Sequence, residues 1–98
     1  MLDYAKSGEI AFRVARKTLG KENVVRVFTE PMFDAEGNDA LRVNIVIQPD
    51  MLDHVDGKAL IQTLMKLNKN LREAGEDRQS VVFYATEEEL ATSDEPEP

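Results

Sequence analysis

The fold is decided by residues 40–48, which read ALRVNIVIQ. Large aliphatic side chains recur at every second position from Leu41 to Ile47, with Arg42 and Asn44 between them. Strict alternation of this kind predicts a β-strand that turns one face to the core and the other to water.

A second strand is predicted just upstream, over residues 24–33, which are rich in β-branched and aromatic side chains. Both of its faces carry apolar groups, so the pattern does not say which face is inward. Pro31 has no N–H to donate to a sheet, which indicates an edge or a bulge near the end of this strand. The polar run 34–39 predicts a turn, and the two strands therefore form an antiparallel hairpin.

Helices are expected on either side of this hairpin. Residues 4–19 place apolar side chains at helical spacing, and Gly20 follows where a C-cap is expected. The second helix begins at Asp53 or Asp56 and ends at Ala74. Four leucines recur along it at helical spacing and are flanked by Ile61 and Met65: Leu60, Leu64, Leu67 and Leu71.

The C-terminal part adds a third strand over residues 80–85 and a single helical turn capped by Thr86. Residues 91–98 are acidic and contain two prolines, so we expect a disordered tail after a single domain spanning residues 1–90.

These elements predict an α+β fold of order αββαβ, with a three-stranded, mainly antiparallel sheet and two helices packed on one face. The helical crossover makes the last two strands run in the same direction. We expect the third strand beside the first, in the order 2-1-3, with a place beside the second strand as the alternative. The open edges of such a sheet invite pairing with another chain, including a homodimer.

Composition limits the possible functions. The 98 residues include no cysteine, no apolar run long enough to span a membrane and no signal-peptide core, which predicts a cytoplasmic protein without membrane partners. The net charge is −7, with +2 over residues 1–30 and therefore −9 over the rest. This balance disfavours nucleic acid and favours a basic protein partner.

No catalytic constellation is recognisable in the sequence. The single histidine, His54, lacks a second group for acid–base work or zinc binding, and no serine has a histidine at triad spacing. Residues 34–39 cluster oxygen ligands, but the glycine stands fourth in the run and not sixth, as a calcium loop requires. We therefore expect a protein that is not an enzyme and that has no cofactor and no metal.

Two charged groups are candidates for partner binding. The first is a basic stripe on the first helix, and the second is a run of acidic residues near the C-terminus. These residues are Arg13, Arg16, Lys17, Lys21, Glu87, Glu88 and Glu89.

Residues 41–90 resemble small bacterial single-domain proteins of unknown function, through the runs 56–60, 73–78 and 84–90. The resemblance implies no activity. By analogy of size and charge, the chain is expected to be a regulatory or antitoxin-like accessory subunit that binds a protein stoichiometrically. The alternative is a nucleic-acid-binding protein that uses the basic stripe of the first helix.

Overall fold

The structure is a computed structural model and describes residues 1–93. Its elements follow the order α1 (Tyr4–Leu19), β1 (Val24–Phe33), β2 (Asp39–Ile47), α2 (Met51–His54), α3 (Gly57–Glu73), β3 (Gln79–Ala85) and α4 (Glu87–Ser93). The α+β class is confirmed. The expected order αββαβ omitted α2, and the helical turn expected after Thr86 continues to Ser93 as α4.

The sheet has the order β1-β2-β3, with β1 antiparallel and β3 parallel to the central strand β2. The order 2-1-3 was therefore wrong, and the sheet is mixed rather than mainly antiparallel. The physical reason is that β2 is better suited than β1 to the central position of the sheet. On β2, Ile45 and Val46 are both fully buried although they point to opposite faces, whereas Pro31 of β1 cannot donate to a further strand.

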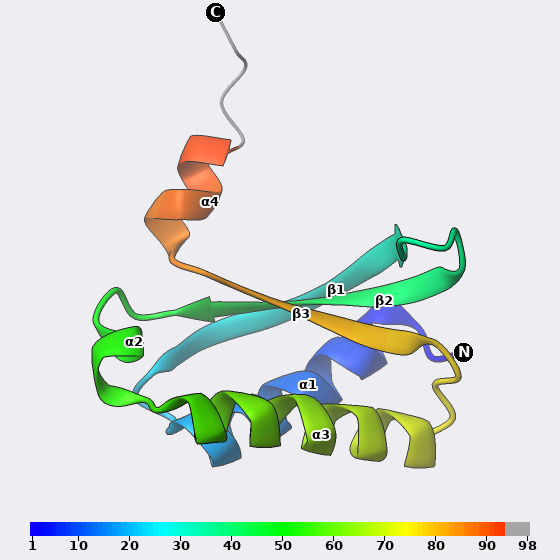
Figure 1. The fold of residues 1–98 in the computed structure, drawn as a ribbon, viewed down its shortest axis with the longest axis horizontal. Helices are drawn as coiled ribbons and strands as arrows, with labels where there is room; N and C mark the ends of the chain where they lie inside the picture. The colour runs from blue at the N-terminus through cyan, green and yellow to red at the C-terminus, as the bar shows by residue number, and fades with distance from the viewer. Residues whose placement is uncertain (94–98) are drawn as a thin grey trace, which may run out of the picture.

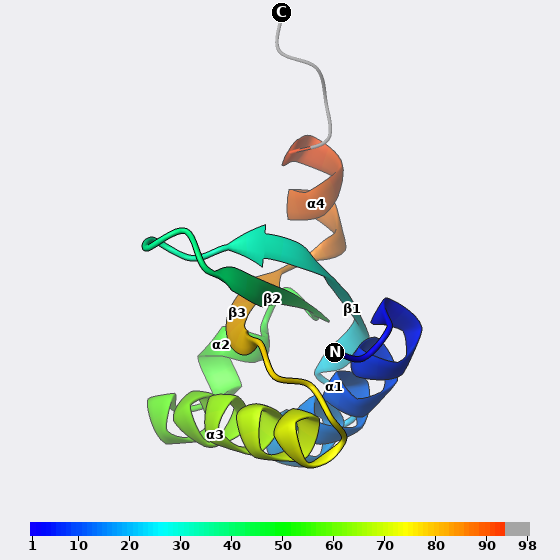
Figure 2. The same cartoon turned by 90° about the vertical axis from the view of Figure 1, so that its right-hand side faces the viewer.

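α1 and α3 run antiparallel against one face of the sheet, and α4 projects from the opposite side (Figures 1 and 2). The hydrophobic core lies between the helices and β2, where Val43 and Ile45 pack with Ala11, Ala15 and Leu67. A hydrogen bond of 2.6 Å between the hydroxyls of Thr18 and Thr63 joins the two helices, because both side chains lie on the facing sides.

An aspartate side chain caps the start of each of the two long helices. Asp3 accepts a hydrogen bond from the Lys6 N–H at 2.7 Å, and Asp56 accepts one from the Ala59 N–H at 2.9 Å. Of the two expected starts of the second long helix, Asp56 is therefore the observed cap.

None of the helices between residues 1 and 93 has the length and apolar character needed to cross a membrane. The expected disordered tail overlaps α4 up to Ser93, and residues 94–98 lie outside the described part of the chain.

Candidate functional site

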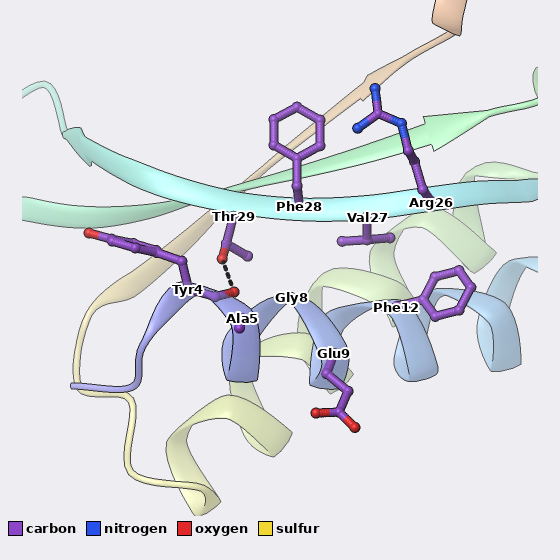
Figure 3. Close-up of a pocket in the computed structure, with 9 residues that line it drawn as sticks. All are labelled: Tyr4, Ala5, Gly8, Glu9, Phe12, Arg26, Val27, Phe28 and Thr29. Atoms are coloured by element: carbon purple, nitrogen blue, oxygen red, sulfur yellow. Dashed lines mark hydrogen bonds between the residues drawn. The ribbon is translucent and has the colours of Figure 1, made fainter.

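A groove of about 510 Å³ runs between α1 and β1 (Figure 3). One helical face of α1 forms one wall, and four consecutive residues of β1, from Arg26 to Thr29, form the other. Successive side chains of a strand point to opposite faces. A hollow that touches all four therefore lies along the edge of β1. The complete lining is Tyr4, Ala5, Gly8, Glu9, Phe12, Arg26, Val27, Phe28 and Thr29.

Alternate peptide groups of β1 point away from β2. The Asp34 N–H donates to the Asn38 carbonyl at 2.9 Å at the end of the hairpin. Hydrogen-bonded and non-bonded pairs alternate from there along the antiparallel register. It follows that the peptide groups of Val27 and Thr29 point away from β2, toward an edge where residues 1–93 place no other strand.

Gly8 is the unusual residue of the groove. It lies inside α1, in the second turn of the helix, where glycine costs about 1 kcal/mol relative to alanine. A Cβ at this position would lie 3.7 Å from the Val27 carbonyl oxygen and 4.0 Å from the Phe28 Cα, which are ordinary van der Waals distances. Packing within the described chain therefore does not require a glycine, and its effect is to leave room above the strand edge.

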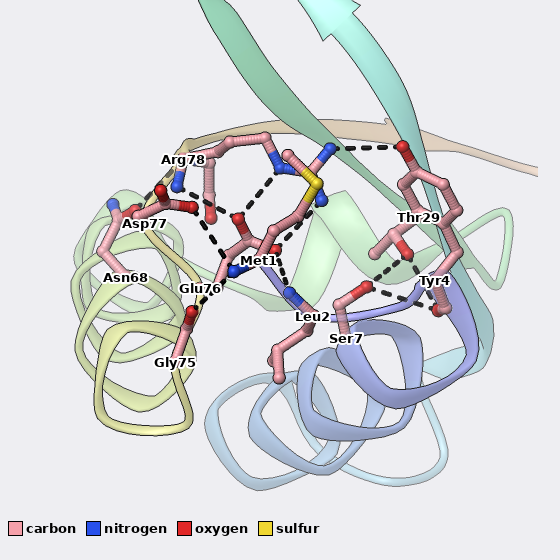
Figure 4. Close-up of polar contacts among 11 residues, drawn as sticks. Met1, Leu2, Tyr4, Ser7, Thr29, Asn68, Gly75, Glu76, Asp77 and Arg78 are labelled. Carbon is pink, nitrogen blue, oxygen red and sulfur yellow. Dashed lines mark hydrogen bonds and ion pairs between the residues drawn. The ribbon is translucent and has the colours of Figure 1, made fainter.

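Hydrogen bonds hold α1 at a fixed distance from β1 at one end of the groove. Thr29 donates from its hydroxyl to the Tyr4 carbonyl at 3.0 Å, and the hydroxyls of Ser7 and Thr29 lie 2.7 Å apart (Figure 4). Both side chains are buried. The width of the groove at this end is thus set by internal contacts.

A buried ion pair secures the segment that precedes α1 (Figure 4). Arg78 forms hydrogen bonds of 2.9 and 3.0 Å with the two carboxylate oxygens of Glu76, and the two side chains are only 6% and 0% exposed. Glu76 also accepts from the Leu2 N–H at 3.2 Å, and Arg78 donates to the Tyr4 hydroxyl at 3.2 Å. This network ties the start of α1, and with it Tyr4 of the groove, to the loop between α3 and β3.

The Arg78 guanidinium and the surrounding N–H donors lower the pKa of Glu76 to about 2. A carboxyl whose pKa is lower in the folded chain than in the unfolded chain stabilises the fold above its unfolded pKa. We therefore expect the free energy of unfolding to fall by about 3 kcal/mol as the pH drops from roughly 5 to 2. Urea unfolding across this pH range measures the loss. The variant Glu76→Gln should show a shallower dependence, and an equal slope in both proteins would contradict the assignment to Glu76.

The sheet face opposite α1 and α3 carries a polar and aromatic layer. Arg42 lies 3.9 Å above the Phe83 ring and Arg26 lies 5.0 Å above the Phe28 ring. Arg42 also donates to Asn44 at 2.9 Å, and Asn44 donates to Glu30 at 3.0 Å. Guanidinium groups therefore lie over two of the aromatic rings on this face.

The structure places the four predicted basic residues in three different surroundings. Arg13 and Lys17 face a cleft between α1 and α3, together with Lys66 and Lys69 of α3. Arg16 instead lies 5.1 Å from the centre of the Phe12 ring, beside the groove. The remaining residue, Lys21, lies in the turn after α1.

The predicted acidic residues lie in the first turn of α4, and two of them have structural roles. Glu87 accepts hydrogen bonds from Arg26 at 2.8 and 3.2 Å, and these bonds hold the pKa of Glu87 below its usual value. Glu89 accepts from the Thr86 N–H at 2.9 Å and forms a capping box with Thr86. Since Arg26 lines the groove, the acidic end of α4 lies next to one end of the groove.

The other candidates that the sequence raised are accounted for by local contacts. His54 ends α2, and its Nε2 lies 3.2 Å from the Asp50 carboxylate on the exposed surface. Asp34 caps the hairpin turn by accepting from the N–H groups of Glu36 and Asn38, both at 2.9 Å. In the described part of the chain, no three histidine, aspartate or glutamate side chains are grouped in a way that would hold a metal ion.

No protein-family model matches the sequence, and comparison with curated proteins and with solved structures finds no significant similarity. Function therefore has to be argued from the site itself.

Proposed function

We propose that this chain is a protein-binding module, a regulatory or antitoxin-like accessory subunit, that receives an extended segment of its partner along the edge of β1. The observation that supports this proposal best is the groove between α1 and β1, which runs along the strand whose Val27 and Thr29 peptide groups point away from β2. A peptide that adds a strand to an open sheet edge gains affinity from main-chain hydrogen bonds and specificity from its alternate side chains.

The charges around the groove indicate the chemistry of the partner. Glu9 lies on the helical wall, and Glu87 is bound to Arg26 at the strand wall. Glu88 and Glu89 follow on the exposed first turn of α4, and the whole chain carries a net charge of −7. An extended segment with lysine or arginine side chains would be attracted to this end, and it would associate faster at low salt.

Gly8→Ala tests the groove directly. We expect this change to stabilise the fold by up to about 1 kcal/mol, because alanine is the better helix former and its Cβ has room. The same methyl group would lie 3.7 Å from the Val27 carbonyl oxygen, an acceptor that an added strand would use. Partner binding should therefore weaken at least tenfold, measured by calorimetry with a partner recovered by affinity purification from the source cell.

Gly57→Ala is the matched control, because Gly57 begins α3 and nothing lies within 4 Å of a Cβ at that position. It should leave partner affinity unchanged. If both variants bind like the parent, strand addition at β1 is the wrong mode. If the purification recovers no stoichiometric partner, the protein-binding class itself is wrong.

Deletion of residues 87–98 should reduce the affinity for the partner and should make that affinity less dependent on salt.

Nucleic-acid binding through α1 is the alternative proposal, and the shared cleft of Arg13 and Lys17 is the observation that favours it. A gel shift at low salt, with the parent and with Arg13→Glu/Lys17→Glu, separates the two proposals. A shift that the double variant abolishes would favour nucleic acid.

A further inference from the structure

α1 and α3 enclose a second hollow of about 270 Å³, which we call the cationic cleft. Four of its seven lining residues are cations and none is acidic: Arg13, Val14, Lys17, Thr18, Lys66, Lys69 and Asn70. Cations from two different helices thus converge on one small volume, and charge complementarity calls for an anion there.

Helix dipoles do not explain this cluster. A dipole favours cations only in the last turn, which holds Arg16 and Lys17 in α1 and Arg72 in α3. Arg13 and Lys66 lie further inside their helices. Like charges one turn apart on a helix, such as Arg13 and Lys17, cost a few tenths of a kcal/mol, so the cluster is mildly unfavourable without a ligand.

Acidic neighbours do not neutralise the cluster either. Within residues 1–93, the one ion pair that these four cations form joins Arg13 to Glu9, at an N–O distance of 4.0 Å. Both of its side chains are more than 60% exposed, and exposed pairs of this kind contribute little. The positive charge of the cleft therefore remains available to an incoming group.

The neutral polar groups of the cleft are already engaged. The Thr18 hydroxyl lies 2.6 Å from the Thr63 hydroxyl and donates to the Val14 carbonyl at 3.0 Å. The Asn70 side-chain amide donates to the Lys66 carbonyl at 2.7 Å. A ligand would therefore be recognised mainly by the four cations, and this favours a ligand that presents several charged acceptor oxygens.

We propose that the cationic cleft binds the phosphate group of a small molecule. A phosphate offers up to two negative charges and three acceptor oxygens, and a guanidinium such as that of Arg13 binds two of these oxygens at once. The volume is below the range of roughly 300–1,000 Å³ that encloses a whole drug-sized ligand. The cleft therefore holds the phosphate, and the rest of the ligand extends outward.

A long polyanion fits less well than a compact phosphate. α1 and α3 contain eight cationic and two acidic side chains, a net charge of +6, so the remainder of the chain carries −13. This acidic remainder would repel an extended nucleic acid, whereas a single phosphate group stays within the basic helix layer.

Titration with pyrophosphate, followed by the amide signals in two-dimensional NMR, tests this proposal. We expect saturable shifts confined to the segments 13–18 and 66–70, and a dissociation constant at least tenfold higher in Lys17→Gln/Lys66→Gln. Lys21→Gln/Lys58→Gln is the matched control, because it removes the same charge from outside the cleft and should leave the constant within twofold of the parent. Circular dichroism checks that both variants are folded.

Three results of this titration would overturn the proposal: equal weakening in both double variants, shifts of similar size at Arg26 and Arg42, or no saturation. An oligonucleotide of about 20 nucleotides serves as the second arm. If it binds the cleft more tightly than pyrophosphate, an extended polyanion is the ligand and the compact phosphate is wrong.

Discussion

Replacing Arg78 by methionine should lower the free energy of unfolding by about 3–5 kcal/mol, the cost of leaving one member of a buried ion pair without its partner. In Arg78→Met the carboxylate of Glu76, which is fully buried in the parent, loses hydrogen bonds of 2.9 and 3.0 Å. The Leu2 N–H and the Arg78 N–H cannot neutralise its charge. Chemical unfolding at neutral pH measures the effect, and the loss would be a large part of the stability of a domain of this size.

A double-mutant cycle separates the ion pair from simple packing loss. Glu76→Gln/Arg78→Met removes both charges and leaves an amide oxygen that can accept from the Leu2 N–H. We expect the double variant to be clearly more stable than the sum of the two single effects predicts, because no unpaired charge is left in the interior. Strict additivity would show that Arg78 acts only through packing.

Leu67→Ala is the second change with a large expected effect. Leu67 is fully buried in the core between α3 and the sheet. Truncation of such a leucine removes transferred apolar surface and leaves a cavity, which costs about 2–5 kcal/mol. Leu64 offers a matched control on the same helix, since its side chain is 39% exposed.

Leu64→Ala should cost less than about 1 kcal/mol, because less apolar surface is lost and solvent fills the space. The two midpoints of urea unfolding can be compared directly, provided that the slopes agree. Equal losses would mean that Leu64 is covered in solution, and the most direct explanation would be a second copy on that face of α3.

Leu64 and Leu67 show what the periodicity of apolar residues can predict and what it cannot. Leucine spacing in residues 60–71 predicted the helix correctly, and Leu67 and Leu71 are buried as expected. Ile61 and Met65, which flank these leucines, are 63% and 66% exposed. Periodicity shows that a helix has an apolar side, but the width of the buried stripe depends on how α1 packs beside α3.

Strand order could not be derived for a similar reason. Alternation identified residues 40–48 as a strand, and the crossover rule gave its direction relative to β3. Neither rule says which neighbour β3 chooses. Pro31 is the residue that could have decided the strand order, because a strand edge that carries a proline is poorly suited to pairing with a further strand. The same edge of β1 lies along the groove.

The candidate site was the least predictable part. Gly8 was a usable signal, because it is a glycine inside an otherwise regular helical pattern. Half of the cations in the cationic cleft could be named from the sequence, because Arg13 and Lys17 were among the predicted basic residues. Lys66 and Lys69 join them only because two helices far apart in the sequence pack together.

The contact of Leu2 and Tyr4 with Glu76 and Arg78 also bears on how the protein matures on the ribosome. More than 70 residues separate the two sides of this contact. α1 is therefore synthesised long before residues 76–78, which form these contacts with its start. Until residue 78 leaves the exit tunnel, the segment at the start of α1 lacks these contacts, and a chaperone or the partner itself would meet it in that state.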